Sequence, residues 1–207
     1  MVLRREHHLT SIVTVGALCA KRQVVTWSST DKVNATLSNG NLTCTFAAVG
    51  SCNSSNSYST GKKYFEVLLT ATDGASGNQF IGVQASGEPT SGGTQNLVSH
   101  GWCYASSGFT EDHGSISAGH TSTWSVGDVI GVAVDFDAGK IWFALNGSWI
   151  AGSPSAGTGA TYTNITSGNW CAAIGSNTGT TVGGTGRFTN AAMGFTIPSG
   201  FASWAGS

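Results

Sequence analysis

The chain has 207 residues and a formal net charge of −1, and only 9% of its residues are charged. The length is typical of one domain with a substantial core, and the near-neutral charge gives no electrostatic basis for binding nucleic acid. Its 7 tryptophans and 9 phenylalanines supply the apolar material for that core, which argues against a disordered chain.

The N-terminal segment, residues 1–23, differs from the rest of the chain in charge. Residues 1–22 hold four basic residues against Glu6, whereas the remainder holds five basic and nine acidic residues. Basic residues also flank the apolar-leaning stretch 9–20, as in a secretory signal, but its interior threonines and serine weaken that reading. The stretch is too short to span a bilayer. Two interpretations stay open: a targeting segment, or an arm that docks on the domain at 24–207 or on a neighbouring subunit.

Short strands separated by turn residues follow one another from residue 24 onward, and no stretch has the 3.6-residue period of a helix. We predict strands at 24–27, 35–37, 42–46, 61–70, 80–83, 101–104, 129–136, 141–145, 148–150, 170–174 and 186–188. Regular strands joined by glycine-, serine- and asparagine-rich turns indicate an all-β sandwich or barrel.

The hairpin formed by 129–136 and 141–145 is the predicted centre of the domain. Its strands turn at Asp137-Ala138-Gly139, and Asn146-Gly147 is a strong signal for a second hairpin. Neither strand has a clean polar face. We therefore expect this hairpin to be covered on both sides.

Several of these segments together resemble a SPRY domain, in order and in spacing, over about residues 26–204. The resemblance is carried by 61–67, 81–83, 101–104, 127–131 running into Asp135, and Asn146-Gly147. The closing run 188–204, the segment 146–159 and the opening 27–42 are similar to SPRY proteins encoded by bacteriophages and their bacterial hosts.

The resemblance implies a bent sandwich of two antiparallel sheets, similar to a concanavalin-like jelly roll, that binds proteins or surfaces through loops at one end. It implies no catalytic machinery and no cofactor. The expected protein is a phage virion component, such as a capsid decoration, fibre or tail-associated protein. Its expected partners are other virion proteins or a protein or glycan of the host surface, with oligomerisation through the arm. A lectin or glucanase on a similar sandwich and a secreted host protein are the alternatives.

Three acidic residues are candidates for a catalytic role. Asp135 and Asp137 could act as a glycosidase pair, but their position at a three-residue turn favours a structural role. Glu66 lies in a strand between apolar neighbours, which indicates a buried structural carboxylate, and Arg187 is its expected mate. No hydrolase elbow, phosphate-binding loop or zinc-protease motif occurs in the chain.

The five cysteines have no regular spacing, so they do not form a disulfide framework. A bond between Cys44 and Cys52 stays open, because these residues could lie on neighbouring strands. Cys103 and Cys171 each follow a tryptophan within a strand and are expected to be small buried hydrophobes.

The loop 105–123 is the best candidate for ligand recognition. It presents Phe109, Asp112, His113 and His120 on a glycine- and serine-rich scaffold, a composition suited to adaptable contacts. The histidines and the neighbouring carboxylates could also bind a metal ion. The ligands of zinc sites usually occur in more closely spaced pairs along the sequence, and we expect no metal here. An ordinary long connection is the alternative.

Overall fold

The computed structural model describes residues 24–88, 96–117, 119 and 122–206. The predicted arm or targeting segment 1–23 and His120 lie outside the described residues. Within them, no helix combines the length and the hydropathy needed to cross a membrane.

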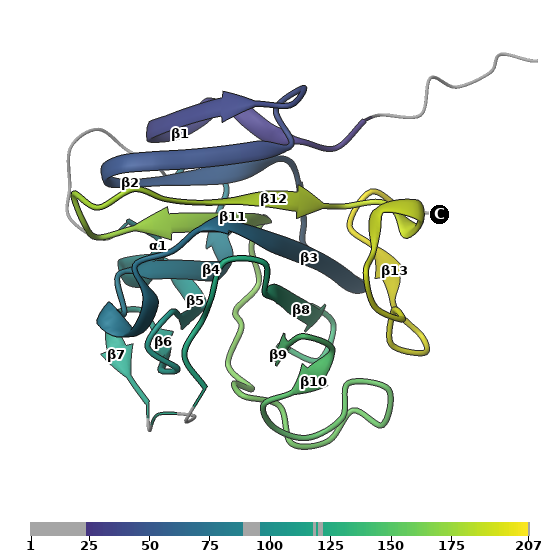
Figure 1. Cartoon of the computed structure of the whole chain (residues 1–207). Helices are drawn as coiled ribbons and strands as arrows, with labels where there is room; N and C mark the ends of the chain where they lie inside the picture. The colour runs from purple at the N-terminus through teal and green to yellow at the C-terminus, as the bar shows by residue number, and fades with distance from the viewer. Residues whose placement is uncertain (1–23, 89–95, 118, 120–121, 207) are drawn as a thin grey trace, which may run out of the picture.

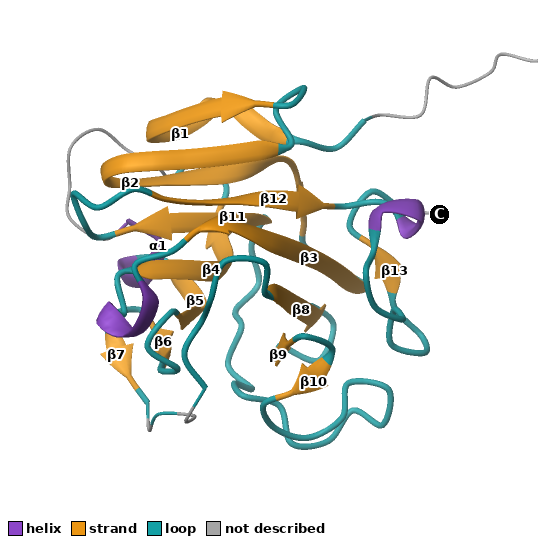
Figure 2. Ribbon diagram, in the orientation of Figure 1, coloured by secondary structure: helices purple, strands orange, loops and turns teal. Residues whose placement is uncertain are grey.

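Thirteen strands of the described chain join into one strongly bent sheet that folds over into two layers (Figures 1 and 2). The first layer contains β3 (Lys62–Ala71), β8 (Val129–Asp135), β9 (Lys140–Leu145), β10 (Ser148–Trp149) and β12 (Val182–Arg187). The second layer contains β4 (Gln79–Ala85), β5 (Gly101–Ala105), β6 (Thr110–Asp112), β7 (Ser115–Ile116) and β11 (Trp170–Ser176). This arrangement confirms the predicted all-β sandwich.

The remaining elements are two long strands, one short strand and three helical turns. They are β1 (Trp27–Ser38), β2 (Thr43–Tyr58), β13 (Ala202–Ser203), α1 (Asn96–Ser99) and the 3-10 turns Gly74–Ser76 and Asn190–Ala192. All of the strand pairs are antiparallel except that of β13 with β3.

β2 joins the two layers. Its first residues pair with β12, as in Phe46↔Val182, and its later residues pair with β11, as in Cys52↔Ile174. β1 follows β2 across both layers on its other side (Figure 1). The prediction of separate strands at 24–27 and 35–37, and of a strand ending at residue 46, was therefore wrong. The polar run 50–58 lacks the apolar alternation that marks a strand in the sequence, yet it is strand throughout.

Gly50 permits the bend of the β1–β2 ribbon. A Cβ atom at this position would lie 2.2 Å from the carbonyl oxygen of Val33, so no side chain fits. Opposite it, Asn34 adopts a left-handed conformation with φ of 52° at a register shift in β1, and its Nδ2 donates to the Val49 carbonyl. Extra residues of this kind bend a strand locally.

The core fills the space between the two layers. Alternate residues of β3, β8 and β9 point inward and meet alternate residues of β4, β5 and β11. The fully buried side chains of this core include Phe65, Val67, Ile130, Val132, Phe143, Ile81, Val83, Tyr104 and Ile174. Ile130, Val132 and Phe143 of the central hairpin are thus buried in this core, whereas Leu145 at the end of β9 is only partly buried against it.

The outer face of the central hairpin is also covered. Tyr64, Ala133 and Trp142 are buried there, and the C-terminal segment packs over them with Ile197 and Phe201. This second apolar layer explains why neither hairpin strand has a polar face.

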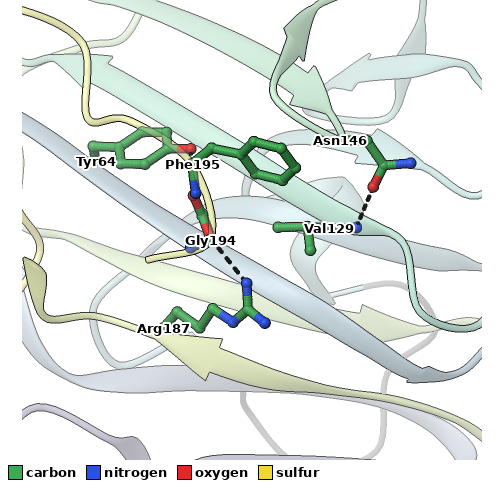
Figure 3. A network of polar contacts seen from close by, with 7 residues as sticks. Tyr64, Val129, Asn146, Arg187, Gly194 and Phe195 are labelled. Carbon is green, nitrogen blue, oxygen red and sulfur yellow. Dashed lines mark hydrogen bonds and ion pairs between the residues drawn. The ribbon is translucent and has the colours of Figure 1, made fainter. Parts of the chain in front are cut away.

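Glu66 attaches the C-terminal segment to the outer face. Its carboxylate is completely buried, lies 3.3 Å from Arg187 Nη1, and accepts the backbone N–H groups of Gly194 (2.7 Å) and Phe195 (3.0 Å). Tyr64 Oη donates a further hydrogen bond at 2.9 Å. Figure 3 shows Tyr64, Arg187, Gly194 and Phe195 gathered at this point. The predicted structural role of Glu66 and its pairing with Arg187 are confirmed.

The four described cysteines are buried free thiols. Cys44 and Cys52 both belong to the main core, where burial and then a hydrogen bond with Cys52 raise the pKa of Cys44. Cys103 and Cys171 are buried as predicted. Burial is the main cause that raises the pKa of Cys171 to about 12.

Candidate functional site

The candidate loop contains a small hairpin that the sequence did not reveal. β6 and β7 are joined by the two-residue turn His113-Gly114, and Asp112 pairs with Ser115 across it. Both turn residues have positive φ, 47° and 83°, as a tight hairpin requires. Glycine tolerates this conformation and histidine adopts it more readily than most residues, so Asp112 and His113 are fixed at the hairpin tip.

Asp112 is the centre of a chain of short hydrogen bonds. Its Oδ1 lies 2.6 Å from His113 Nδ1, and its Oδ2 accepts Asn164 Nδ2 at 2.6 Å. Asn164 Oδ1 in turn accepts Trp102 Nε1 at 3.1 Å. The tip of the β6–β7 hairpin and the loop that carries Asn164 are thereby joined to the buried Trp102 of β5.

Aromatic side chains form the base beneath these polar groups. The His113 ring stands edge-on to Trp102 with centroids 4.6 Å apart, and Trp102 stands edge-on to Trp170 at 4.8 Å. Both tryptophans are buried, whereas the His113 side chain is 45% exposed and Asn164 is exposed. The result is a polar rim held on a rigid aromatic base.

The neighbouring residues tie the loop to the rest of the sandwich. Tyr162 Oη is hydrogen-bonded to the hydroxyl groups of Thr110 and Ser117, and the Tyr162 backbone pairs with Ile141 of β9. Burial raises the pKa of the Tyr162 hydroxyl and of the Glu111 carboxyl. Glu111 is nearly buried in β6, so it is less available to a partner than Asp112.

Of the four residues predicted to bind a ligand, the structure brings Asp112 and His113 into direct contact. Phe109 is 41% exposed and precedes β6, where its carbonyl closes a turn with Ala105. Its ring lies beside Gly119. His120 lies outside the described residues.

Sequence reasoning missed two members of the cluster, Asn164 and Trp102. Asn164 is 52 residues from Asp112 along the chain, whereas Trp102 is close in sequence and pairs with Asp112 across β5 and β6. Neither belongs to a motif with a recognised spacing. Asn164 lies in a loop outside the candidate segment 105–123, and Trp102 has the sequence context of an ordinary core residue. Only the folded structure brings Asn164 to Asp112.

The carboxylates considered for glycoside hydrolysis do not form a catalytic pair. Asp135 binds Lys62 at 3.1 Å and caps the N–H of Ala138, whereas Asp137 accepts the N–H of Gly61. Glu66 is fully enclosed by its structural partners. Most glycoside hydrolases need two carboxyl groups on either side of the scissile bond, and these residues satisfy turns and buried donors instead.

A metal site is not evident in the described residues. They contain no group of three or more histidine, cysteine, aspartate or glutamate side chains placed to hold an ion. The Asp112–His113 pair supplies two such side chains, fewer than a structural zinc site uses. What the cluster offers is an arrangement of hydrogen-bonding groups on an aromatic base, which suits recognition.

Comparison with known proteins identifies the fold family. The family model described as SPRY domain matches residues 62–185, more than half of the chain. Among solved structures, the SPRY domain of human HERC1 is similar with a TM-score of 0.62 and 15% sequence identity, over 78% of this chain and 95% of that one. No curated protein matched the sequence. The chain therefore belongs to the SPRY domain family.

Proposed function

We propose that this chain is a non-catalytic module that binds a protein partner through the surface formed by Phe109, Asp112, His113 and Asn164, called here the Asp112 surface. SPRY domains generally act as protein-binding modules without catalytic activity, and membership in the family suggests the same role here. The finer assignment, to this surface, rests on its geometry.

One observation carries the choice of surface: the hydrogen-bonded series Trp102–Asn164–Asp112–His113. It fixes exposed polar groups from two loops before any partner arrives. Pre-organised side chains lose less conformational entropy on binding. Phe109, 41% exposed on the same loop, adds an aromatic anchor of the kind enriched at protein interfaces.

We further propose that the protein is a component of a phage virion. The support is the resemblance of the segments 27–42, 146–159 and 188–204 to SPRY proteins of phages and their hosts. In this role the partner is another virion protein or a protein of the host surface. The basic segment 1–22, beside a domain with more acidic than basic residues, is the proposed arm for attachment or oligomerisation.

Site-specific cross-linking tests the surface. A photoreactive benzoylphenylalanine replaces Phe109 in the full chain, and the matched control carries it at Phe195, which is exposed to a similar degree (41% against 37%) but lies beside Gly147 at the other hairpin. Irradiation within purified virions should yield a covalent product with one partner only for the Phe109 variant. An equal or stronger product from the Phe195 variant contradicts the assignment of the surface.

Two further measurements separate the alternatives. Mass spectrometry of purified particles should detect the chain together with its N-terminal peptides, whereas a mature protein starting near Lys21 would support secretion instead. Binding to glycan arrays that is lost in the double variant Asp112→Ala/His113→Ala would support a lectin on the same sandwich and would count against a protein partner.

A further inference from the structure

A polar cavity of about 220 Å³ lies on the second layer, apart from the Asp112 surface. It opens between the start of β1, the end of β2 and the turn after β4, with Cys171 of β11 in its wall. None of its lining residues belongs to the Asp112 surface. The proposed binding of a partner at the Asp112 surface does not involve this cavity.

Two neighbouring irregularities in the sheet create this cavity. The pairing of β1 with β2 shifts between Trp27↔Ser54 and Lys32↔Cys52, so residues 28–31 loop outward, and Ser28 Oγ closes that loop by accepting the N–H of Asp31 at 2.9 Å. The pairing of β2 with β11 also shifts between Ala173↔Asn53 and Cys171↔Ser57. The space between the two displaced segments is not filled by an apolar side chain.

The lining has an unusual composition for a gap in a β-sandwich. It consists of five serines, one threonine, Asp31, Asn56 and Cys171. Asp31 is its only acidic residue, and none of the lining residues is basic. The Cys171 thiol is buried and its pKa is raised to about 12, first by burial, so it adds no charge near neutral pH. The wall therefore has one negative charge and several hydrogen-bond acceptors.

Asp31 is held in place by the protein but is not neutralised by it. Its Oδ2 accepts Nδ2 of the fully buried Asn53 at 2.9 Å and the N–H of Gly87 at 3.2 Å. In the described part of the chain Asp31 takes part in no ion pair. Its Oδ1 accepts no hydrogen bond from the described residues and is left for a ligand.

The lysine and arginine side chains of the described residues contact groups other than Asp31. They contact carbonyl groups, carboxylates or an aromatic ring, in the pairs Lys32 with Ala35, Lys62 with Asp135, Lys63 with the Tyr58 ring, Lys140 with Gly157, and Arg187 with Glu66. None of these contacts involves Asp31, so the described part of the chain gives it no ion-pair partner.

Asn56 supplies a second unmatched acceptor in the cavity wall. Its Nδ2 donates to Tyr58 Oη at 3.0 Å and to the Trp204 carbonyl at 3.3 Å, which fixes the orientation of the amide. Its Oδ1 is left buried without a donor. The wall thus combines an unpaired buried acceptor with a carboxylate that has no ion-pair partner among the described residues, and unpaired buried acceptors are unfavourable.

We propose that this cavity binds the ammonium group of a lysine side chain from a partner protein. An ammonium group supplies one positive charge and three donors, which match the Asp31 carboxylate and the acceptors around it. A divalent metal ion fits less well, because calcium takes six to eight oxygen ligands, usually with several carboxylates, and this wall has one carboxylate. This cavity is a second contact region, and ligand binding there does not depend on the Asp112 surface.

The test is an amide NMR titration of the full chain with n-butylammonium, the probe that represents a lysine side chain. The backbone amides of Asp31, Gly87 and Ser57 should shift with saturation, and the uncharged analogue 1-butanol should leave them unchanged. Asp31→Asn should weaken the binding roughly tenfold or more, because a charge-assisted hydrogen bond is lost, while its amide oxygen can still accept from Asn53 and Gly87. Ser86→Phe, on the exposed turn of the wall, should block binding by occupying the cavity.

Asp137→Asn is the matched control. Asp137 is an exposed acid at a different turn, where it accepts the N–H of Gly61, so this variant has the same change in net charge and should bind n-butylammonium like the parent chain. Equal shifts with 1-butanol, stronger binding of n-propylguanidinium, calcium-dependent shifts of the same amides, or no shift with any probe would each overturn the lysine assignment. A negative result would leave the cross-linking prediction for Phe109 unaffected.

Discussion

The Glu66 carboxylate and the Arg187 guanidinium meet 3.3 Å apart beneath the C-terminal segment, and the pair joins two strands to a loop. Glu66 is fully buried, whereas the Arg187 side chain is 23% exposed. The same carboxylate binds the N–H groups of Gly194 and Phe195. A single side chain of β3 therefore holds the segment that covers the outer face of the central hairpin.

We expect Glu66→Gln to destabilise the fold by about 2–4 kcal/mol, because it leaves Arg187 without its counter-charge and places an amide NH₂ against backbone donors. Urea denaturation of the variant measures the change. Arg187→Met and the double variant complete a mutant cycle, in which a coupling of about 1 kcal/mol or more is expected for groups in contact. Additive single effects would show that the ion pair itself contributes nothing.

Phe143→Ala tests the core side of the central hairpin. Phe143 is completely buried against the second layer, so its truncation removes apolar burial and leaves a cavity, and we expect a loss of about 3–5 kcal/mol. The control is Val126→Ala, because Val126 is 64% exposed. A melting midpoint of the Phe143 variant equal to that of the control would contradict the assignment of inner and outer faces.

Gly50→Ala tests the bend between the layers. The added Cβ atom would lie 2.2 Å from the Val33 carbonyl oxygen, and the backbone has to move to accommodate it. We expect a loss of about 1–3 kcal/mol or more, as for other overpacked sites. Gly179→Ala is the control, since a Cβ atom there meets open space. Equal stabilities of the two variants, measured by thermal denaturation, would show that the ribbon bends without needing glycine.

Alkaline pH should destabilise the protein through its buried thiols. Burial raises the pKa of Cys171 from 9.0 to about 12, so its protonated form is favoured in the folded state. The corresponding stability is fully present below pH 9 and is lost as the pH rises toward 12. Over that interval, Cys171→Ala should reduce the slope of unfolding free energy against pH by about 1.4 kcal/mol per pH unit. An unchanged slope in urea titrations from pH 8 to 11 would contradict this.

Asn164→Ala tests the cohesion of the Asp112 surface. Without the Asn164 side chain, Trp102 Nε1 and Asp112 Oδ2 lose their common partner, and we expect a loss of about 1 kcal/mol with faster hydrogen exchange at the Trp102 indole and the His113 amide. Asn169→Ala is the control, because Asn169 is exposed and its side chain makes no hydrogen bond within the described residues. Identical exchange in both variants would mean that Asn164 does not hold the surface together.

The class of fold, the central hairpin and the structural role of Glu66 could be predicted without the structure. These depend on local signals, because alternating apolar residues and asparagine–glycine turns act over a few positions. The sequence could also place Asp112 and His113 on an exposed loop. In each case the residues that determine the local structure lie within one strand or one turn.

Three features emerge only once the chain is folded: the polar run 50–58 is a strand that is buried over 50–54, Asn164 joins Trp102 to Asp112, and Asp31 faces a cavity with no basic partner among the described residues. These features depend on which strands become neighbours and on where their registers shift. A non-local β-sheet brings together residues far apart along the chain, and their contacts follow from backbone pairing that no short sequence window encodes.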